Sequence, residues 1–198
     1  MAQGVRDLPQ SAPRRHLHTR RVTSRGYLRD GGLWDIDGEL VDEKTYTSAD
    51  RERGPLPAGM PIHHMRARLT LDNEMRVVEA HAAMPTVPFG YCAGAGAGAG
   101  AVGGVSQLKG ALVGAGWRRA VDAAMGATQG CTHMRELFYA LATTAFQTAS
   151  SYREQHMPEL GAPSSGNGGR PFYSNQCHSW ADTSPVVAVY FPQFHRKP

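Results

Sequence analysis

The chain has 198 residues, of which 41% are hydrophobic and 19% charged, and its formal net charge is +4. This length and composition suit one globular domain with a substantial core. Three cysteines without paired spacing argue against a disulfide scaffold and favour a reducing, cytoplasmic location. The N-terminus lacks the apolar segment of a secretory signal, and the uncharged stretch 84–108 is too rich in Gly, Ala and Pro for a membrane span.

The positive charge is concentrated at the N-terminus, where residues 1–29 hold seven arginines and one acid. A basic arm can neutralise phosphates, but its one aromatic, Tyr27, comes at its end and no nucleic-acid-binding motif follows. We favour a solvated arm whose later arginines pair with Asp30, Asp35 and Asp37. Residues 1–15 are therefore expected to be a disordered basic tail, with neither nucleic acid nor membrane as partner.

Alternating and β-branched residues predict strands in the first half of the chain. "VTSRGYLRD", "LWDIDGELVDEKTY", "PIHHMRARLTL" and "RVVEAHAAM" each have this character. Asp37-Gly38 predicts a tight hairpin turn, residues 48–60 a polar loop, and "LDNEM" a further turn. Together they predict an antiparallel meander of about four strands.

The second half has helical periodicity. The Gly/Ala run 93–104 is expected to be a flexible loop, and "WRRAVDAAM" a short helix closed by Gly126. A long helix, "CTHMRELFYALATTAFQTASSYREQHM", ends before Pro158, with a loop over 159–171 and a last strand or extended clasp in "PVVAVYFPQF". One apolar stripe follows this helix: Met134, Leu137, Phe138, Leu141, Ala145 and Phe146. The fold class is thus α+β, with residues 16–198 forming a single domain in which the sheet packs against one long and one shorter helix.

His63 interrupts an otherwise apolar strand face. In residues 61–71 it shares a face with Met65 and Leu69, whereas His64 and Arg68 point to the opposite face. Burial lowers the pKa of a histidine, so that such a ring is a neutral base near pH 7. A core histidine bonded to a backbone carbonyl explains the pattern equally well.

The start of the long helix is a second candidate site. Its free N–H groups suit an anion or a thiolate, and Cys131 and Thr132 lie where such a site would be. His133 and Glu136, three residues apart, lie on one helix face. An N-cap with a surface His–Glu pair is the simpler interpretation. Zinc binding is a further alternative, with four candidate ligands: Cys131, His133, Cys177 and His178. The sequence has neither the usual cysteine spacing of a structural zinc site nor an HExxH motif.

Four stretches resemble a bacterial family catalogued as domain of unknown function 2889. They are "HTRRVTSRGYLRDGGLWDIDGELVDEKTY", "PAGMPIHHMRARLTLD", "GAGWRRAVDAAMGATQGCTHMRELFYALATTAFQT" and "CHSWADTSPVVAVYFPQFH". The resemblance runs from His18 onward, in the right order. It implies a link with aromatic or steroid breakdown, because genes of this family often lie beside genes of such pathways.

The resemblance highlights a set of polar and special positions: Arg29, Asp30, Trp34, Asp35, Gly38, Lys44, His63, Arg68, Gly130, Cys131, His133 and Glu136. Three features depart from the family's pattern. Gly31 and His64 stand where the family usually has acids, and the "AGAGAGAGA" run has no counterpart. These departures indicate a specialised substrate.

These observations predict a cytoplasmic enzyme without a cofactor or metal, a lyase or isomerase that acts by proton transfer on a hydroxylated aromatic or polycyclic catabolite. A retro-aldol cleavage that releases a small aldehyde such as formaldehyde fits these residues. The expected catalytic residues are His63, Lys44, Arg68, His133, Glu136 and Asp35. The expected substrate-binding residues are Tyr27, Arg29, Asp30, Trp34, Cys131 and His64. The alternatives are a non-catalytic small-molecule-binding protein and the zinc protein, and homo-oligomer formation stays open.

Overall fold

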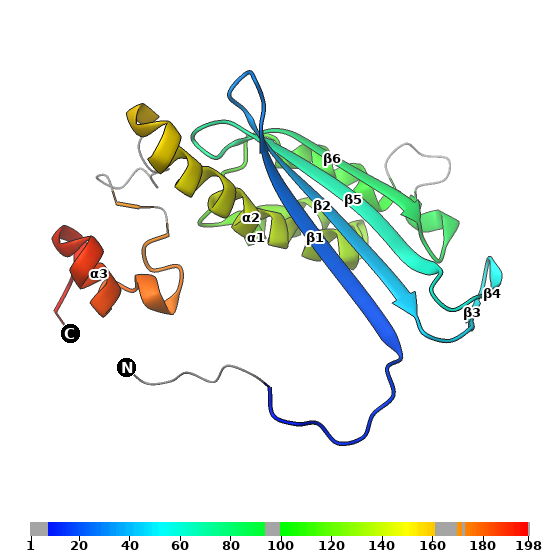
Figure 1. Ribbon diagram of the computed structural model, residues 1–198. Helices are drawn as coiled ribbons and strands as arrows, with labels where there is room; N and C mark the ends of the chain where they lie inside the picture. Colours follow the sequence, from blue (N-terminus) through cyan, green and yellow to red (C-terminus); the bar gives the residue numbers. More distant parts are fainter. Residues whose placement is uncertain (1–7, 94–99, 161–169, 172, 198) are drawn as a thin grey trace.

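The computed structural model describes residues 8–93, 100–160, 170–171 and 173–197. It confirms the α+β class and the antiparallel meander. Four consecutive long strands form one sheet in the order β1-β2-β5-β6 (Figure 1). Their bounds are β1 His18–Leu28, β2 Trp34–Lys44, β5 Pro61–Leu71 and β6 Val77–Thr86.

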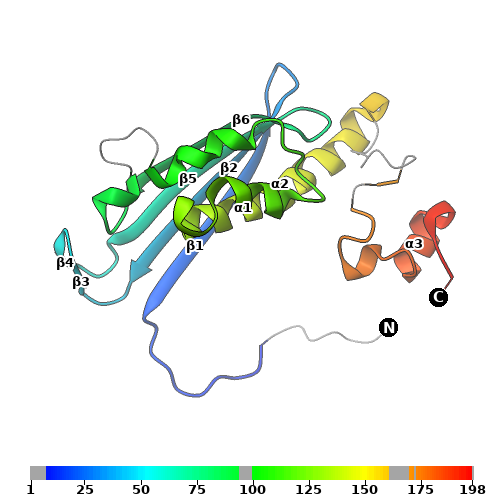
Figure 2. The ribbon, with the colours of Figure 1, turned by 180° about the vertical axis from the view of Figure 1, so that it is seen from behind.

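Helices cover one face of this sheet, which we call the inner face (Figure 2). Along β5, Met65, Ala67, Leu69 and Leu71 are buried on this face, while Arg66 and Arg68 are exposed on the outer face, as the alternation predicts. The covering elements are η2 Gly100–Leu108, α1 Trp117–Met125 and α2 Thr132–His156. The short 3-10 helices are η1 Gly90–Ala93, η3 Ala127–Gln129, η4 Pro158–Leu160, η5 His178–Trp180 and η6 Pro192–Phe194.

The long helix α2 packs closely on β2, and Gly38 makes this possible. A Cβ atom at Gly38 would lie 2.7 Å from Leu141 Cδ2 and 2.9 Å from Leu137 Cδ1.

The predicted turn at Asp37-Gly38 is wrong, since both residues lie in the middle of β2. The chain turns instead at residues 29–33, where Arg29 N–H donates to the Leu33 carbonyl at 2.8 Å.

Two expected loops contain regular structure. Residues 48–60 include a small hairpin of β3 Ser48–Asp50 and β4 Gly54–Leu56. Within the expected loop 93–104, residues 94–99 lie outside the described part of the chain, and the 3-10 helix η2 begins at Gly100. The loop prediction is wrong for residues 100–104, because η2 carries Val105 and Leu108 into the core.

The C-terminal segment is helical rather than a strand or clasp. Helix α3 spans Pro185–Tyr190, with Ser184 as its N-cap accepting a hydrogen bond from Val187 N–H at 3.1 Å. Ser at the N-cap followed by Pro at the first helical position favours a helix start, which outweighed the β-branched residues. Both ribbon views place α3 apart from the sheet (Figures 1 and 2).

The N-terminal end of the described chain has no regular secondary structure before β1. Residues 8–17, at the N-terminus, are exposed and contain neither helix nor strand; residues 1–7 of the expected tail lie outside the described part.

No helix in the described ranges is both long and apolar enough to cross a membrane.

Replacing Gly38 with Ala is expected to lower the free energy of unfolding by about 1–3 kcal/mol, because overpacking forces α2 away from β2. Gly31→Ala is the matched control, since a Cβ there meets nothing within 4 Å. Urea denaturation of both variants measures the difference. Equal stabilities of the two variants would contradict the close-packing role of Gly38.

Candidate active site

On the inner face, three neighbouring strands each carry an ionisable residue, and these three residues lie near the same end of the sheet. Arg20 lies near the start of β1, Asp42 near the end of β2 and His63 near the start of β5. Because the strands run antiparallel, Arg20 pairs with Asp42, and Asp42 pairs with His63. The register of β2 and β5 shifts immediately after this pair, between Asp42 and Glu43. Such irregularities are common beside functional sites, where they redirect side chains.

Asp42 is the centre of this group and is only 2% exposed. Arg20 donates from Nε to Oδ1 and from Nη2 to Oδ2, both at 2.8 Å. His63 Nδ1 lies 3.0 Å from Oδ2, His18 Nε2 lies 3.2 Å from Oδ1, and His133 Nε2 lies 3.8 Å from Oδ2. Burial by itself raises the pKa of Asp42, but the hydrogen bonds and charge of Arg20 outweigh it, so the pKa lies below the ordinary carboxyl value. Asp42 is therefore an anion with four polar side chains around it: Arg20, His18, His63 and His133.

The first turn of α2 completes the group. Cys131 is the N-cap residue, and His133 and Glu136 follow it on the helix. The His133 ring stacks on the His63 ring with centroids 4.0 Å apart and planes inclined by 32°. Arg20 Nη1 donates to Glu136 Oε2 at 2.9 Å, so Arg20 ties α2 to the sheet. Glu136 thus pairs with Arg20 rather than with His133, its expected partner.

His63 has the tautomer of a general base. Ionised Asp42 only accepts hydrogen bonds, so Nδ1 of His63 carries the proton and Nε2 keeps its lone pair. Burial lowers the pKa of His63, the neighbouring His133 and Arg20 charges lower it further, and Asp42 partly opposes them. Its side chain keeps 17% exposure, so the ring is accessible from solvent.

His133 links Asp42 to Cys131. Its Nδ1 lies 3.7 Å from Cys131 Sγ, and its Nε2 faces Asp42. Burial and the charge of Arg20 lower the pKa of His133, while Asp42 and Glu136 raise it. Two neutral imidazoles, a thiol and a carboxylate thus converge at this end of the inner face, and we call Asp42, His63 and His133 the Asp–His–His cluster.

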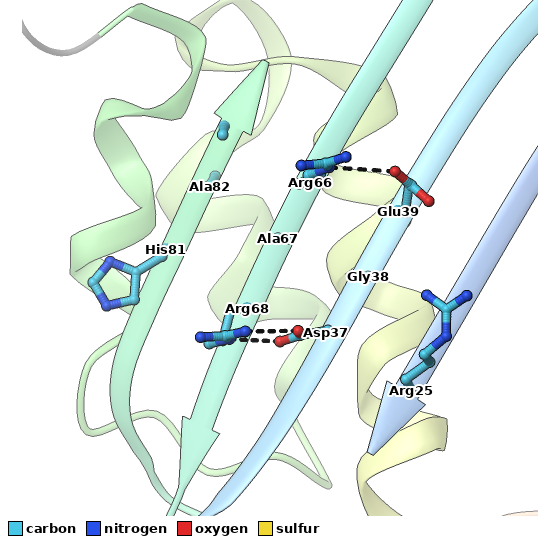
Figure 3. Close-up of a pocket in the computed structure, with 10 residues that line it drawn as sticks. Arg25, Asp37, Gly38, Glu39, Arg66, Ala67, Arg68, His81 and Ala82 are labelled. Atoms are coloured by element: carbon cyan, nitrogen blue, oxygen red, sulfur yellow. Dashed lines mark hydrogen bonds and ion pairs between the residues drawn. The ribbon is translucent and has the colours of Figure 1, made fainter. Parts of the chain in front are cut away.

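Several predicted site residues lie on the outer face instead. Arg68 forms a fork with Asp37, at 2.6 and 2.7 Å, which raises the pKa of Arg68. Together with Arg25 and His81 they line a hollow of about 480 Å³ on this face (Figure 3). Because the sheet separates Arg68 from His63, the structure does not bring these two predicted catalytic residues together.

A second outer network lies near the β1–β2 turn. Arg29 donates to Asp35 at 2.8 Å, and the buried Thr70 hydroxyl donates to Asp35 at 2.6 Å. Burial raises the pKa of Asp35, but these two hydrogen bonds outweigh it and lower the pKa overall. This is the expected pairing of Arg29 with an acid. Arg20 and Arg21 pair instead with Asp42 and Glu43.

The remaining predicted residues are dispersed. Trp34 belongs to the core, with its indole N–H donating to Asn73 Oδ1 at 3.0 Å. Lys44 lies over the Tyr46 ring, 5.4 Å from its centroid. Tyr27, Asp30 and His64 lie outside the cluster, His64 bonding Glu39 on the outer face and Asp30 being exposed at the β1–β2 turn. Of the twelve predicted site residues, the structure brings four together at the cluster: His63, His133, Cys131 and Glu136.

The twelve predicted site residues include neither Arg20 nor Asp42. The signal was present, because the apolar inner rows of β2 and β5 both end in an ionisable side chain, Asp42 and His63. The four-ligand zinc set, the alternative interpretation of the sequence, does not assemble among the described residues. Among the described residues, the His, Cys, Asp and Glu donors form one group of three suited to a metal ion, the Asp–His–His cluster, without Cys131, Cys177 or His178.

The family model described as "Protein of unknown function (DUF2889)" matches residues 18–147, more than half of the chain. The chain belongs to this family. No curated protein and no solved structure matches it. The matched range of the DUF2889 family contains every residue of the Asp–His–His cluster and Arg20, whereas Cys177 and His178 lie outside it.

Asp42→Asn is expected to lower the free energy of unfolding by about 1–3 kcal/mol, because an amide places N–H groups against the donors of Arg20 and His63. Glu43→Gln is the matched control, since Glu43 pairs with exposed Arg21 on the outer face and surface pairs contribute little. Guanidinium unfolding curves compare the two. A loss with Glu43→Gln as large as with Asp42→Asn would contradict the central role of Asp42.

Proposed function

We propose that this protein is a lyase or isomerase that acts by side-chain acid–base chemistry on a hydroxylated aromatic or polycyclic catabolite. The observation that carries the proposal is the Asp42–His63 pair, which leaves Nε2 of a half-buried, neutral imidazole available as a base. Arg20 holds Asp42 in place with two hydrogen bonds. A base oriented in this way requires no nucleotide cofactor.

The second imidazole supplies the other half of acid–base chemistry. His133 stacks on His63 and contacts Cys131 Sγ. His133 and Cys131 can therefore carry protons to and from the base, His63. Arg68 and Lys44 have no part in this version of the mechanism, because Arg68 is on the outer face and Lys44 stacks on Tyr46. The roles of base, orienting carboxylate and second proton carrier fall to His63, Asp42 and His133.

A retro-aldol cleavage fits this arrangement. His63 Nε2 removes the proton of a primary hydroxyl group, the adjacent C–C bond breaks, and formaldehyde leaves. The electron pair of that bond passes into a conjugated carbonyl or quinone-methide group of the substrate. The carbon that formaldehyde leaves then takes back the proton that His63 accepted, either directly or through His133 and Cys131. The substrate's atoms are divided between the two products, and no oxidant or reductant is consumed.

The substrate class and the reaction class have different support. The substrate class depends on the association of DUF2889 genes with aromatic and steroid breakdown, as the resemblance implies. The reaction class depends on the side chains of the cluster. A panel of phenolic compounds that carry a primary hydroxyl group tests both, with formaldehyde trapped chemically and the second product identified by mass spectrometry.

His63→Gln is expected to reduce turnover by about 10²–10⁴-fold with the fold unchanged, because it removes the base. His64→Gln is the matched control, one residue along the strand but on the outer face and bonded to Glu39. Circular dichroism checks the fold of both variants. Unchanged turnover in His63→Gln would contradict the assignment, and tight binding of panel compounds without any product would indicate a binding protein instead.

A further inference from the structure

We infer that Asp42, His63 and His133 form a binding site for a divalent transition-metal ion of the zinc type. Each residue offers one donor atom, and these three atoms lie within 4.8 Å of one another. They come from β2, β5 and the first turn of α2, so the three side chains converge through the fold rather than through sequence proximity.

The separations suit a shared ion. Asp42 Oδ2 is 3.0 Å from His63 Nδ1 and 3.8 Å from His133 Nε2. Ligands about 2.0–2.1 Å from a tetrahedral zinc ion lie roughly 3.3–3.4 Å apart, a value between these two distances.

The surroundings favour a cation of this class. Asp42 is buried and oriented by Arg20, as a metal-ligating carboxylate usually is by its hydrogen-bond partners. The charge of Arg20 is balanced by Glu136, so Arg20, Asp42 and Glu136 together carry a net charge of −1 beside the two imidazoles. Two imidazoles and one carboxylate select zinc, cobalt or ferrous iron over magnesium or calcium. Three protein ligands leave a coordination position open.

The same geometry makes metal binding and base catalysis exclude each other. An ion between Oδ2 and Nδ1 replaces the hydrogen bond that holds His63 as the Nδ1–H tautomer. The proton then resides on Nε2, and the ring is no longer a base. This consequence rests on the proposed function: zinc is expected to inhibit the proton-transfer reaction of the metal-free protein.

Binding is tested on the full chain after chelator treatment, by titration with Zn²⁺ in a calorimeter and with Co²⁺ by visible absorption. We expect one ion per chain, no response to Mg²⁺, and a rise in melting temperature with Zn²⁺. His63→Gln and His133→Gln each remove one ligand and should weaken binding by more than about 100-fold. His64→Gln should bind as the wild type does. Wild-type protein that binds no Zn²⁺, or ligand variants that bind it equally well, would overturn the site.

Turnover on the phenolic panel, measured with and without Zn²⁺, separates this inference from the proposed function. Loss of turnover at one equivalent of Zn²⁺, restored by chelator, supports the inhibition. Turnover that depends on His63 without any Zn²⁺ binding overturns the metal site but leaves the proposed function intact. Turnover that requires Zn²⁺ supports the site and overturns the inhibition. An inactive protein that still binds Zn²⁺ through His63 and His133 supports the site alone.

Discussion

The ion pair between Arg20 and Asp42 is the interaction on which the rest of the site depends. Arg20 forms a two-bond fork with the carboxylate and uses its remaining nitrogen to bind Glu136 of α2, joining β1, β2 and the long helix. Removing Arg20 would leave the buried Asp42 carboxylate without its cationic partner, which is costly in a protein interior. With Asp42 held as an anion, both His63 and His133 are oriented around it.

Close packing of α2 on the sheet is the second constraint. Gly38 lets the helix approach β2 so closely that Leu137 and Leu141 contact the strand backbone. This approach brings the first turn of α2 over the end of the inner face, where His133 stacks on His63. A wider spacing between helix and sheet would separate the two rings. The backbone of one strand residue thus contributes to the geometry of a site several residues away.

The sheet divides the polar residues into two groups with different properties. The outer face carries cross-strand ion pairs such as Arg68–Asp37 and His64–Glu39, whose side chains are partly exposed. In the inner group Asp42 is buried and the two histidines are half-buried, and burial lowers the pKa of both histidines. Neutral imidazoles with free lone pairs can accept a proton or a metal ion, but not both at once. The two proposals for this site arise from that single property.

The four long strands, their faces and the long helix are predictable from the sequence, because alternation and 3.6-residue periodicity reflect local geometry. The sequence also singled out His63, His133 and Cys131. Asp42 and Arg20 complete the site through the fold, since residues 21 or 22 positions apart meet through the strand register alone. The fold likewise changed the meaning of Gly38 from a turn residue to a packing contact, because a glycine's role depends on what approaches it.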